Sequence, residues 1–583
     1  MHIPRSEYPR PQFVRQNWKN LNGQWQFEID QGRSGQSRGL HLEGTPLSGS
    51  ILVPFCPESA LSGVEYKDFM YGVWYKRTVD LEEITGRVKL HFGAVDYHCQ
   101  AFVNGTFVGE HKGGYVSFAF DITDALRSGE NEITVFAQDD SRDRLIPSGK
   151  QSNRFESWGC RYTRTTGIWQ TVWLEFLPEN HIASVKYYPN ITNGSVTVEA
   201  RLAGSGDFSC HITFGGREMG AFTAKNAAGC LHFTVPLKET HLWDVGQGNL
   251  YDVAFSFGED RVSSYFGLRE IRIEGHKVLL NDRPVFQRLV LDQGFYPTGI
   301  YTAPTDEDLV QDIKLSLAVG FNGARLHEKV FEERFLYHAD RMGYLVWGEY
   351  PDWGLDHSYA DSIYSILPEW IEEVQRDFNH PAIVGWCPHN ETWDQNGRKQ
   401  FDPGIQMVYD VTKALDPTRP CIDSSGNFHV KTDIYDVHDY NQDPVTFKAH
   451  YDRLMEDGTL YEVFDPPQCH KGRYVGRQQY PGKIPAFVSE YGGIRWAPGE
   501  KDENRIGSWG YGKDVCDEEE FLYRFRGLTD ALLDNHRMFG LCYTQLTDVE
   551  QEQNGLYTYD RKPKFDTRTL HAILSRKAAI EEV

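Results

Sequence analysis

The sequence predicts a multidomain chain in which two antiparallel β-sandwich domains precede a (β/α)8 barrel. The chain has 583 residues, which is more than a single hydrophobic core usually serves. Up to residue 268 it reads as strands and turns with almost no helical period. From residue 269 onward, buried strand patterns alternate with amphipathic helical stretches, which is typical of a parallel sheet.

The first predicted domain, residues 1–180, is an antiparallel sandwich. The Asn104-Gly105 pair is a strong hairpin-turn signal, because both residues tolerate a positive φ. Stretches that alternate apolar and polar residues indicate strands with one buried face. Examples lie at residues 23–29, 88–92, 100–103 and 132–137.

The second predicted domain, residues 181–268, continues in strands. Its short length fits a small immunoglobulin-like β-sandwich. The strand-like stretches lie at residues 185–188, 196–200, 211–214 and 251–257.

The third predicted domain, residues 269–583, has eight candidate strands, which is the number that a (β/α)8 barrel needs. The strands are predicted at residues 285–291, 321–326, 344–349, 382–388, 420–425, 433–438, 484–490 and 538–545. Amphipathic helical stretches separate most of them, for instance at residues 306–319, 333–342, 364–378 and 518–536.

Two of these apolar runs lead directly into a glutamate. Residues 381–388 are followed by His389-Asn390-Glu391, and residues 484–488 are followed by Ser489-Glu490. An apolar run bounded by Pro and Gly reads as a strand buried on both faces, and its carboxyl end lies at the mouth of the barrel. Two carboxylates facing each other across a barrel mouth are the apparatus of glycoside hydrolysis.

The charge balance and the cysteines limit the partners and the compartment. The chain has 60 basic and 83 acidic residues, a net charge of −23, which argues against a nucleic-acid or anionic-membrane partner. No run approaches 18 apolar residues, and the N-terminus shows no apolar signal segment. Ten scattered cysteines without a Cys-x-x-Cys pair are typical of a reduced compartment, so we expect a cytoplasmic protein. Whether the chain forms a homo-oligomer stays open.

Five stretches together give the chain a family resemblance that runs nearly from end to end. It resembles glycoside hydrolase family 2, the family of β-galactosidases, β-glucuronidases and β-mannosidases. The most specific stretch is Arg376-Asp-Phe-Asn-His-Pro381 leading to Asn390-Glu391. The others are Trp18-Lys-Asn-Leu-Asn-Gly-Gln-Trp25, Tyr162-Thr-Arg-Thr-Thr-Gly-Ile-Trp169, Ala414-Leu-Asp-Pro-Thr-Arg-Pro420 and Asn554-Gly-Leu-Tyr-Thr-Tyr-Asp-Arg-Lys-Pro-Lys564.

The resemblance implies that the first domain is a sugar-binding jelly roll and that the barrel carries out a retaining double displacement. Glu490 is then the nucleophile and Glu391 the acid/base, with their carboxyl groups ~5–5.5 Å apart. Glu391 must donate a proton, and we expect Glu490 and desolvation to raise its pKa. No cofactor is implied. No metal site is expected either, because the Glu-x-His motif that holds magnesium in large β-galactosidases is missing after the third barrel strand.

Further residues are candidates for holding the substrate or the nucleophile. Asn390 would bind the sugar 2-hydroxyl, Tyr440 would position Glu490, and Arg325 would keep Glu490 ionised. The alternatives are a turn residue for Asn390, a core residue for Tyr440 and a structural ion pair for Arg325. The other candidates, at predicted strand ends or beside the glutamates, are His327, Glu349, Asp292, Asp423, His438, Trp386 and Trp496. His438 has a buried structural histidine as its alternative.

Three departures from the family pattern leave the sugar open. Arg161 stands where family members carry an acidic residue, Tyr543-Thr-Gln545 replaces an expected tryptophan, and Asn554-Gly-Leu556 replaces an Asn-x-Lys carboxylate clamp. An exo-β-glycosidase acting on β-galactosides is the first expectation. The alternatives are a uronosidase that uses Arg161 or Arg164, a β-mannosidase or an arabinosidase. A more distant alternative is a carbohydrate-binding protein with an inactive barrel, and Arg161 could instead pair with Glu156.

Overall fold

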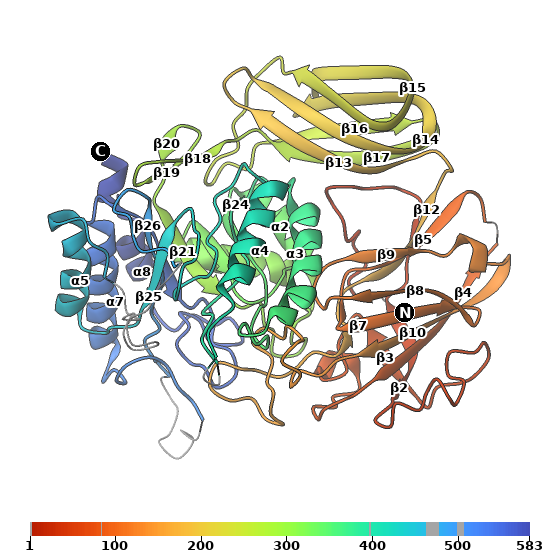
Figure 1. Cartoon of the computed structure of the whole chain (residues 1–583), viewed down its shortest axis with the longest axis horizontal. Helices are drawn as coiled ribbons and strands as arrows, with labels where there is room; N and C mark the ends of the chain where they lie inside the picture. Colours follow the sequence, from red (N-terminus) through yellow and green to blue (C-terminus); the bar gives the residue numbers. More distant parts are fainter. Residues whose placement is uncertain (1–2, 83, 396–397, 462–476, 498–506, 583) are drawn as a thin grey trace.

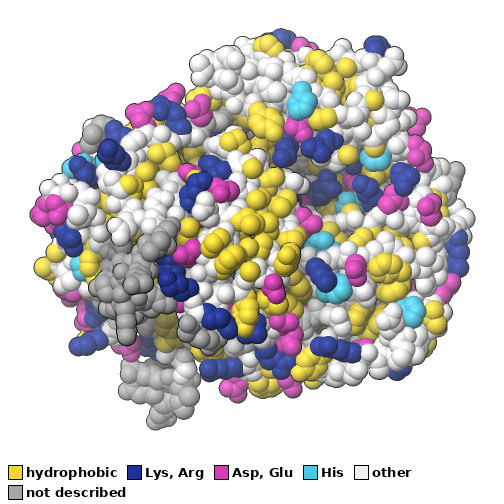
Figure 2. All heavy atoms as spheres, in the orientation of Figure 1, with side chains coloured by type: hydrophobic (Ala, Val, Ile, Leu, Met, Phe, Trp, Pro, Cys, Tyr) yellow, Lys and Arg dark blue, Asp and Glu magenta, His cyan; other side chains and the backbone are white. Residues whose placement is uncertain are grey.

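The protein consists of two β-sandwiches and a barrel (Figure 1). The structure, a computed structural model, describes residues 3–82, 84–395, 398–461, 477–497 and 507–582. None of the described helices combines the length and the apolar character that crossing a membrane requires. Figure 2 shows side chains of both charges interspersed on one face, with apolar side chains gathered near its centre.

The N-terminal jelly roll packs a six-stranded sheet against a four-stranded sheet. Buried apolar residues from both sheets, such as Leu90 and Val135, form its core. The predicted Asn104-Gly105 hairpin is confirmed, since both residues have positive φ and join β7 to β8. The six-stranded sheet has the order β3 (Gly49–Val53), β2 (Gly23–Ile29), β4 (Val73–Leu81), β10 (Gly129–Gln138), β7 (His98–Val103), β8 (Thr106–Lys112). The four-stranded sheet has the order β1 (Trp18–Asn20), β12 (Val172–Leu177), β5 (Arg87–Phe92), β9 (Phe118–Asp121), and β6 (Val95–Asp96) pairs with β11 (Gly167–Ile168).

The second sandwich is built around one long strand, β14 (Ser195–Phe214), which pairs with different partners along its length. Its first half pairs with β13 (His181–Asn190) and its second half with β16 (Leu250–Phe257). β15 (Arg217–Pro236) pairs with it throughout, and β17 (Asp260–Gly267) pairs with β16. Register shifts near the middle of β14 let the strand pass from one layer to the other.

The barrel follows a small antiparallel sheet of β18 (Ile271–Glu274), β19 (Lys277–Leu280) and β20 (Arg283–Pro284). Its parallel strands lie in the order β24 (Ile383–Cys387), β23 (Leu345–Glu349), β22 (Gly323–Leu326), β21 (Gln287–Asp292), β27 (Met538–Thr544), β26 (Ala486–Gly492), β25 (Tyr435–Asp439). The helices are α1 (Asp306–Ala318), α2 (Glu333–Met342), α3 (Ile363–Asp377), α4 (Asp402–Leu415), α5 (Pro444–Glu456), α7 (Glu518–Leu533) and α8 (Thr567–Leu574).

The fifth predicted strand, residues 420–425, is not a continuous strand. Only isolated parallel bridges join it to the β24 side, Trp386 with Cys421 and Asn390 with Ser425. Toward β25 a side-chain contact replaces a ladder: Ser425 Oγ donates to Asp436 Oδ2 at 2.6 Å. The segment thus joins β24 through backbone hydrogen bonds and contacts β25 through a side chain, which the alternation of its residues could not reveal.

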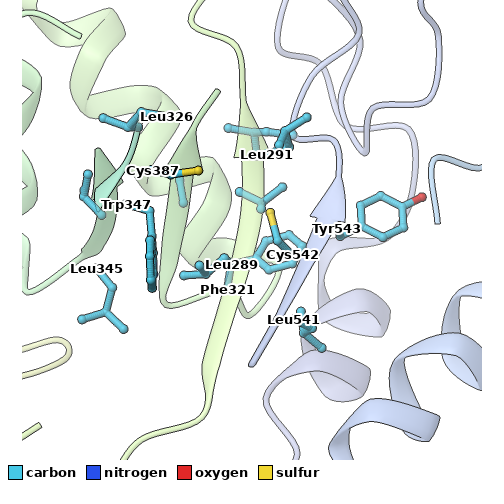
Figure 3. Packing of buried hydrophobic residues seen from close by; sticks show 14 of the residues in the cluster. Leu289, Leu291, Phe321, Leu326, Leu345, Trp347, Cys387, Leu541, Cys542 and Tyr543 are labelled. Atoms are coloured by element: carbon cyan, nitrogen blue, oxygen red, sulfur yellow. The ribbon is translucent and has the colours of Figure 1, made fainter. Parts of the chain in front are cut away.

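The inside of the barrel is filled with apolar side chains below its mouth. Figure 3 shows Leu289, Trp347, Cys387 and Cys542 of this cluster, which come from strands β21, β23, β24 and β27. All four are essentially inaccessible to solvent. Because the interior is closed in this way, chemistry is confined to the carboxyl ends of the strands.

Candidate active site

The two strand-end glutamates meet at the mouth of the barrel, with a histidine between them. Glu490 lies on β26, Glu391 follows β24, and His438 lies on β25. His438 Nδ1 is 2.8 Å from Glu391 Oε1 and 3.4 Å from Glu490 Oε2. One oxygen of each glutamate and one nitrogen of the histidine all lie within 4.8 Å of one another. This separation matches a retaining carboxylate pair and is too short for the inverting arrangement, which needs ~6.5–9.5 Å.

Glu490 is held by donors on both of its oxygens. Arg325 Nη1 donates to Oε1 at 3.2 Å, and the Tyr440 hydroxyl donates to Oε2. Arg325 is itself fixed by a bond to the carbonyl oxygen of Ser489 at 2.7 Å and by an ion pair with Glu349. These contacts fix the orientation of the carboxylate.

Glu349 and His327 support the arginine. His327 Nδ1 is 3.0 Å from Glu349 Oε2, and its Nε2 lies 4.0 Å from Glu490 Oε1. Burial, with a contribution from the charge of Lys150, lowers the pKa of His327 well below its ordinary value. Burial also raises the pKa of Glu349, against the pull of Arg325. Glu349 therefore holds Arg325 in place, while the neutral ring of His327 lies beside Glu490.

Asn390 presents a free amide group to the cavity. Its backbone N–H donates to Asp352 Oδ1 at 2.7 Å, and its Oδ1 accepts from Arg325 Nη2 at 3.2 Å. Within the described part of the chain, its buried Nδ2 has no hydrogen-bond partner. The next residue, Glu391, has a φ of 49°, a left-handed conformation that a non-glycine residue adopts at a cost. Its N–H donates to the Ser425 carbonyl at 2.9 Å, which holds this turn in place.

Nearby charges change the pKa values of His438 and Glu391 in ways that the sequence did not predict. Burial disfavours the charge on His438, but Glu490 and Glu391 outweigh burial and raise its pKa. Burial likewise works to raise the pKa of Glu391, but the hydrogen bond and charge of His438, with Lys150 and Arg325, lower it. The predicted rise in the pKa of Glu391 is therefore wrong for the free protein. That prediction included the effect of Glu490 on the pKa but not the effect of the three cations. His438 and Glu391 titrate as a pair.

Tyr440 is locked against a second ring that the sequence did not single out. Tyr511 stacks on it with 3.4 Å between ring centroids and 1° between planes. The Tyr440 hydroxyl also contacts Thr544 Oγ1 at 3.1 Å. Burial and the charge of Glu490 raise the pKa of Tyr440 well above its ordinary value, so the phenol stays a donor.

Several candidates lie away from the two glutamates. Trp386 is fully buried, donates to Asp416 Oδ2 at 2.8 Å and packs edge-on against Trp370, so it belongs to the core and cannot touch a substrate. Asp292 accepts from the N–H of Gly294, and burial together with Asp312 raises its pKa to about 7. Both corrections have one cause: a strand buried on both faces gives no sequence signal of which way a side chain points.

Trp496 and Asp423 also have other surroundings than predicted. Trp496 is partly buried and stacks on Phe565. Asp423 is fully buried, and its Oδ1 lies 2.7 Å from His429 Nδ1. Its Oδ2 accepts from two backbone N–H groups. In the part of the chain that the structure describes, neither residue makes a hydrogen bond or ion pair with the two glutamates.

The jelly roll contributes cations that lie on Trp353, a ring beside the site. Trp353 Nε1 donates to the Asn390 carbonyl at 3.0 Å. The guanidinium of Arg161 lies 5.1 Å and the ammonium of Lys150 3.5 Å from the centre of this ring. Arg161 contacts the carbonyls of Gly149 and Gln151, and no pairing with Glu156 is seen among the described residues. The sequence analysis missed Lys150 and Trp353, because both lie in loops.

Arg164 does not reach the site. Its guanidinium donates to the backbone carbonyls of Arg154 and Lys67 and packs on Phe69. It therefore ties loops of the jelly roll together.

A buried polar chain lies at the end of the eighth strand. Glu552 accepts from the Tyr162 hydroxyl and from Asn554 Nδ2 at 3.0 Å. Gln293 Nε2 donates to the same tyrosine at 2.8 Å and to Gln545. Burial raises the pKa of Glu552, which Tyr162 and Lys150 partly oppose. This row of hydrogen-bonded polar residues joins the jelly roll to the barrel. A search of the sequence for polar residues at strand ends could not have found it.

The glutamate pair and His438 also form a set of three potential metal ligands. Arg325 donates to Glu490, and Lys150 adds a further positive charge, so the set already faces cations. Such surroundings fit proton transfer better than the binding of a cation.

Comparison with known families matches the three parts of the chain in order. Residues 59–175 match the sugar binding domain of glycosyl hydrolases family 2, residues 180–269 match a further glycosyl hydrolases family 2 domain, and residues 271–492 match the TIM barrel domain of that family. Together the three models match most of the chain.

Similar individual proteins carry two kinds of name. A β-glucuronidase of Paenibacillus borealis is 24% identical over 97% of this chain and 98% of its own length. A putative β-glucuronidase of Formosa agariphila is 26% identical over 77% of this chain, which spans about half, 54%, of that protein. β-Galactosidases are also among the relatives.

Solved structures agree on the fold over nearly the whole chain. A β-glucuronidase from Ruminococcus gnavus in complex with D-glucuronic acid superposes with a TM-score of 0.78 at 19% identity, covering 98% of this chain and all of that one. The three domain matches and the paired glutamates lead to one conclusion: the chain belongs to glycosyl hydrolase family 2 and is a glycoside hydrolase, an exo-acting β-glycosidase.

Proposed function

We propose that the protein is a retaining exo-β-uronosidase, with Glu490 as nucleophile and Glu391 as acid/base. The observation that carries the mechanism is the short separation of the two carboxylates across His438. The substrate class is supported by the relatives, most of which are named β-glucuronidases, and by the cations on Trp353. The first expectation, a β-galactosidase, becomes the second candidate.

In the first step Glu490 attacks the anomeric carbon while Glu391 protonates the glycosidic oxygen. The aglycone leaves as an alcohol, and the sugar stays bound through an ester to Glu490. In the free enzyme the proton lies on His438, 2.8 Å from Glu391 Oε1, because the pKa of His438 is raised and that of Glu391 lowered. Substrate binding removes water from the pair, which favours the neutral form of Glu391.

In the second step Glu391 takes a proton from water, and the resulting attack on the anomeric carbon breaks the ester. Two inversions leave the product in the β configuration. Esterification removes the negative charge of Glu490 and so weakens the attraction that keeps the proton on His438. The free amide of Asn390 Nδ2 is placed to donate to the sugar 2-hydroxyl in both steps.

The β-galactosidase reading is favoured by one feature of the site. Glu552 is a buried acceptor near the end of the eighth strand, where a carboxylate would oppose a uronic acid and suit a sugar hydroxyl. Lys150 offsets that charge, since it lowers the pKa that burial raises. A direct comparison of acidic and neutral sugars therefore decides between the two candidates.

The test uses pairs of 4-nitrophenyl β-glycosides that differ only at carbon 6: glucuronide with glucoside, and galacturonide with galactoside. We expect a higher kcat/KM for the acidic member of at least one pair, and NMR should show a β-configured first product. A 2-deoxy-2-fluoro derivative of the preferred sugar should label Glu490, as peptide mapping would show. An α-configured first product would exclude retention, and preference for the neutral members would exclude the uronosidase.

A cytoplasmic location and the sequence-based domain limits stay predictions.

A further inference from the structure

Lys150 enters the site from the jelly roll on a short loop docked to the barrel. The N–H groups of Ser148 and Gly149 donate to the Trp353 carbonyl at 2.7 and 2.9 Å. Gly149 has a φ of 52°, and a Cβ there would lie 2.5 Å from the carbonyl oxygen of Glu328, so the close approach needs glycine. The loop is therefore set against the barrel, and Lys150 follows it directly.

Lys150 is a buried residue, but its ammonium group has no bonded partner in the described chain and stays open to solvent. The residue is 6% exposed, and its Nζ lies over the indole of Trp353. Over the ranges that the structure describes, this Nζ makes no hydrogen bond and no ion pair within 4.0 Å. An attraction to a ring face stabilises an ammonium group less than bonded oxygens do.

Other buried lysines of this chain differ in this respect. Lys76 donates to the carbonyls of Leu42 and Thr45 and pairs with Glu132. Lys329 donates to two backbone carbonyls. A buried ammonium group is costly unless its protons are bonded, and these two lysines meet that need within the protein. Lys150 does not, so its ammonium group is left to solvent or to a ligand.

Trp353 brings Lys150 close to the glutamate pair, since Nζ lies 3.5 Å from the centre of its indole ring and Nε1 of that ring donates to the carbonyl of Asn390, the residue before Glu391. Burial opposes its charge, but Cys160, Glu328, Glu391 and Glu490 together raise its pKa, so it stays protonated. The three glutamates have contacts of their own, and none of them lies within 4.0 Å of the Lys150 ammonium group. Glu391 and Glu490 hold His438, and Glu328 Oε2 accepts the N–H of Trp353 at 3.1 Å. The donors of Lys150 are thus left for a ligand that shares the cavity with the glutamate pair.

We propose that Lys150 is the residue that binds the carboxylate of the sugar being released. The assignment rests on the proposed uronosidase function and deepens it. It also replaces Arg164, whose guanidinium is occupied by carbonyl oxygens, and leaves Arg161 as a second cation on the same indole ring. A carboxylate that reaches Lys150 gains a charge-assisted hydrogen bond. A neutral sugar with a hydroxymethyl group at that position gains less.

The experiment compares Lys150→Gln, Lys150→Arg and the wild-type protein on the matched 4-nitrophenyl pairs. Arg164→Gln is the control, since it removes a cation from the same domain outside the cavity. We expect Lys150→Gln to lower kcat/KM on the uronide by about 10–100-fold, the loss of one hydrogen bond to a charged group. The neutral partner should change less than about threefold, and so should the acid-to-neutral ratio in Arg164→Gln. Lys150→Arg should keep most of the preference for the acid.

A second measurement needs no variant. Free D-glucuronate and D-glucose, or D-galacturonate and D-galactose, are compared as competitive inhibitors of the wild-type enzyme, and the uronate should inhibit more strongly. Equal inhibition within each pair overturns the proposal, even where Lys150→Gln fails to fold. Equal loss on acidic and neutral substrates in Lys150→Gln also overturns it, while leaving a uronosidase intact. If the wild-type enzyme prefers neutral sugars, the proposed uronosidase function itself is wrong, whatever the variants show.

Discussion

Two neighbouring clusters of this barrel each place a histidine between two carboxylates, and only one of them is suited to catalysis. In the closed cluster, His429 lies 2.7 Å from Asp423 Oδ1 and 3.2 Å from Asp436 Oδ1. In the open cluster, His438 lies between Glu391 and Glu490. Ser425 joins the two, since its hydroxyl contacts both Asp436 and His438.

The clusters differ in what completes their hydrogen bonds. The residues of the closed cluster are sealed from solvent, and its carboxylates accept from backbone N–H groups of Val430, Lys431 and Gly426. In the open cluster the Glu391 side chain is 19% exposed, and donors nearby at Asn390 and Lys150 lack bonded partners in the described chain. A histidine with two acids is therefore a structural unit when it is sealed from solvent, and a reaction centre when it is open to solvent and donors beside it are left for a ligand.

The largest expected effect is at the nucleophile. Glu490→Ala should lower kcat/KM by at least ~10⁴-fold for aryl glycosides with good and poor leaving groups alike, because no glycosyl ester can form. Initial rates with both kinds of substrate measure this. The matched change in the closed cluster, Asp423→Ala, should leave the kinetics of the folded fraction nearly normal. Substantial turnover by Glu490→Ala would remove the distinction between the clusters.

The second effect concerns Glu391. Glu391→Ala should lose ~10²–10⁴-fold on glycosides with poor leaving groups, because these need the proton in the transition state. Activated aryl glycosides should form the intermediate almost normally and stall at its hydrolysis. Added azide should restore turnover and give a β-glycosyl azide, detected by mass spectrometry and NMR. An equal loss with all leaving groups and no azide product would contradict the acid/base role.

The third effect concerns the proton on His438. The raised pKa of His438 lets the pair keep its proton above the ordinary histidine pKa of 6.5. His438→Gln removes this group and leaves Glu391 to hold the proton alone, so the alkaline limb of the kcat/KM profile should move to lower pH. The maximum rate should fall by about 100-fold, at the low end of acid–base contributions. An unchanged alkaline limb would show that His438 has only a structural role.

The fourth effect is on stability and belongs to the closed cluster. His429→Gln should lower the free energy of unfolding by about 3–5 kcal/mol, because it leaves two buried carboxylates without their cation. The pKa of His429 is raised well above 6.5 by its acids despite burial. Its contribution to stability is therefore complete below pH 6.5 and is lost as the pH rises through the higher folded-state pKa. Denaturant titrations of both proteins at several pH values should show the difference shrinking at alkaline pH.

The smallest effect is expected at Asp292, which belongs to neither cluster. Asp292→Asn should change kcat/KM by less than about twofold, as expected for a residue without contact to the glutamates. Burial and Asp312 raise the pKa of Asp292 to about 7, so the native state of the wild-type protein loses stability as the pH rises toward 7. The variant lacks this loss and should be relatively more stable at pH 8 than at pH 5. A large kinetic effect would return Asp292 to the substrate site.

Local sequence patterns were sufficient to place the centre of the site but not its surroundings. Arg325 and Glu490 lie near the carboxyl ends of buried parallel strands and Glu391 follows another, and the barrel geometry brings such positions together. Trp386 was misplaced because its strand is apolar on both faces. Asp423 was expected at the substrate but completes the closed cluster, since the segment at residues 420–425 does not continue as a strand.

Contacts between distant segments were outside the reach of the sequence. Lys150 meets Trp353 only because the jelly roll docks on the barrel, and no periodicity encodes that meeting. The lowered pKa of Glu391 was missed for the same reason, since it depends on three cations from three separate segments. Trp353 follows the third barrel strand by four residues, so a search that extended past each strand end would have found it.

The docked loop at residues 148–150 makes the two domains share one ligand site. A sugar that touches both Lys150 and the glutamates binds only when the jelly roll sits on the barrel, so mass action couples saturation with ligand to the association of the domains. At a ligand concentration 100 times Kd this coupling adds about 2.7 kcal/mol to the docked arrangement. A bound substrate thereby stabilises the interface between the two domains. The resistance of this interface to proteases should therefore increase with the concentration of the sugar.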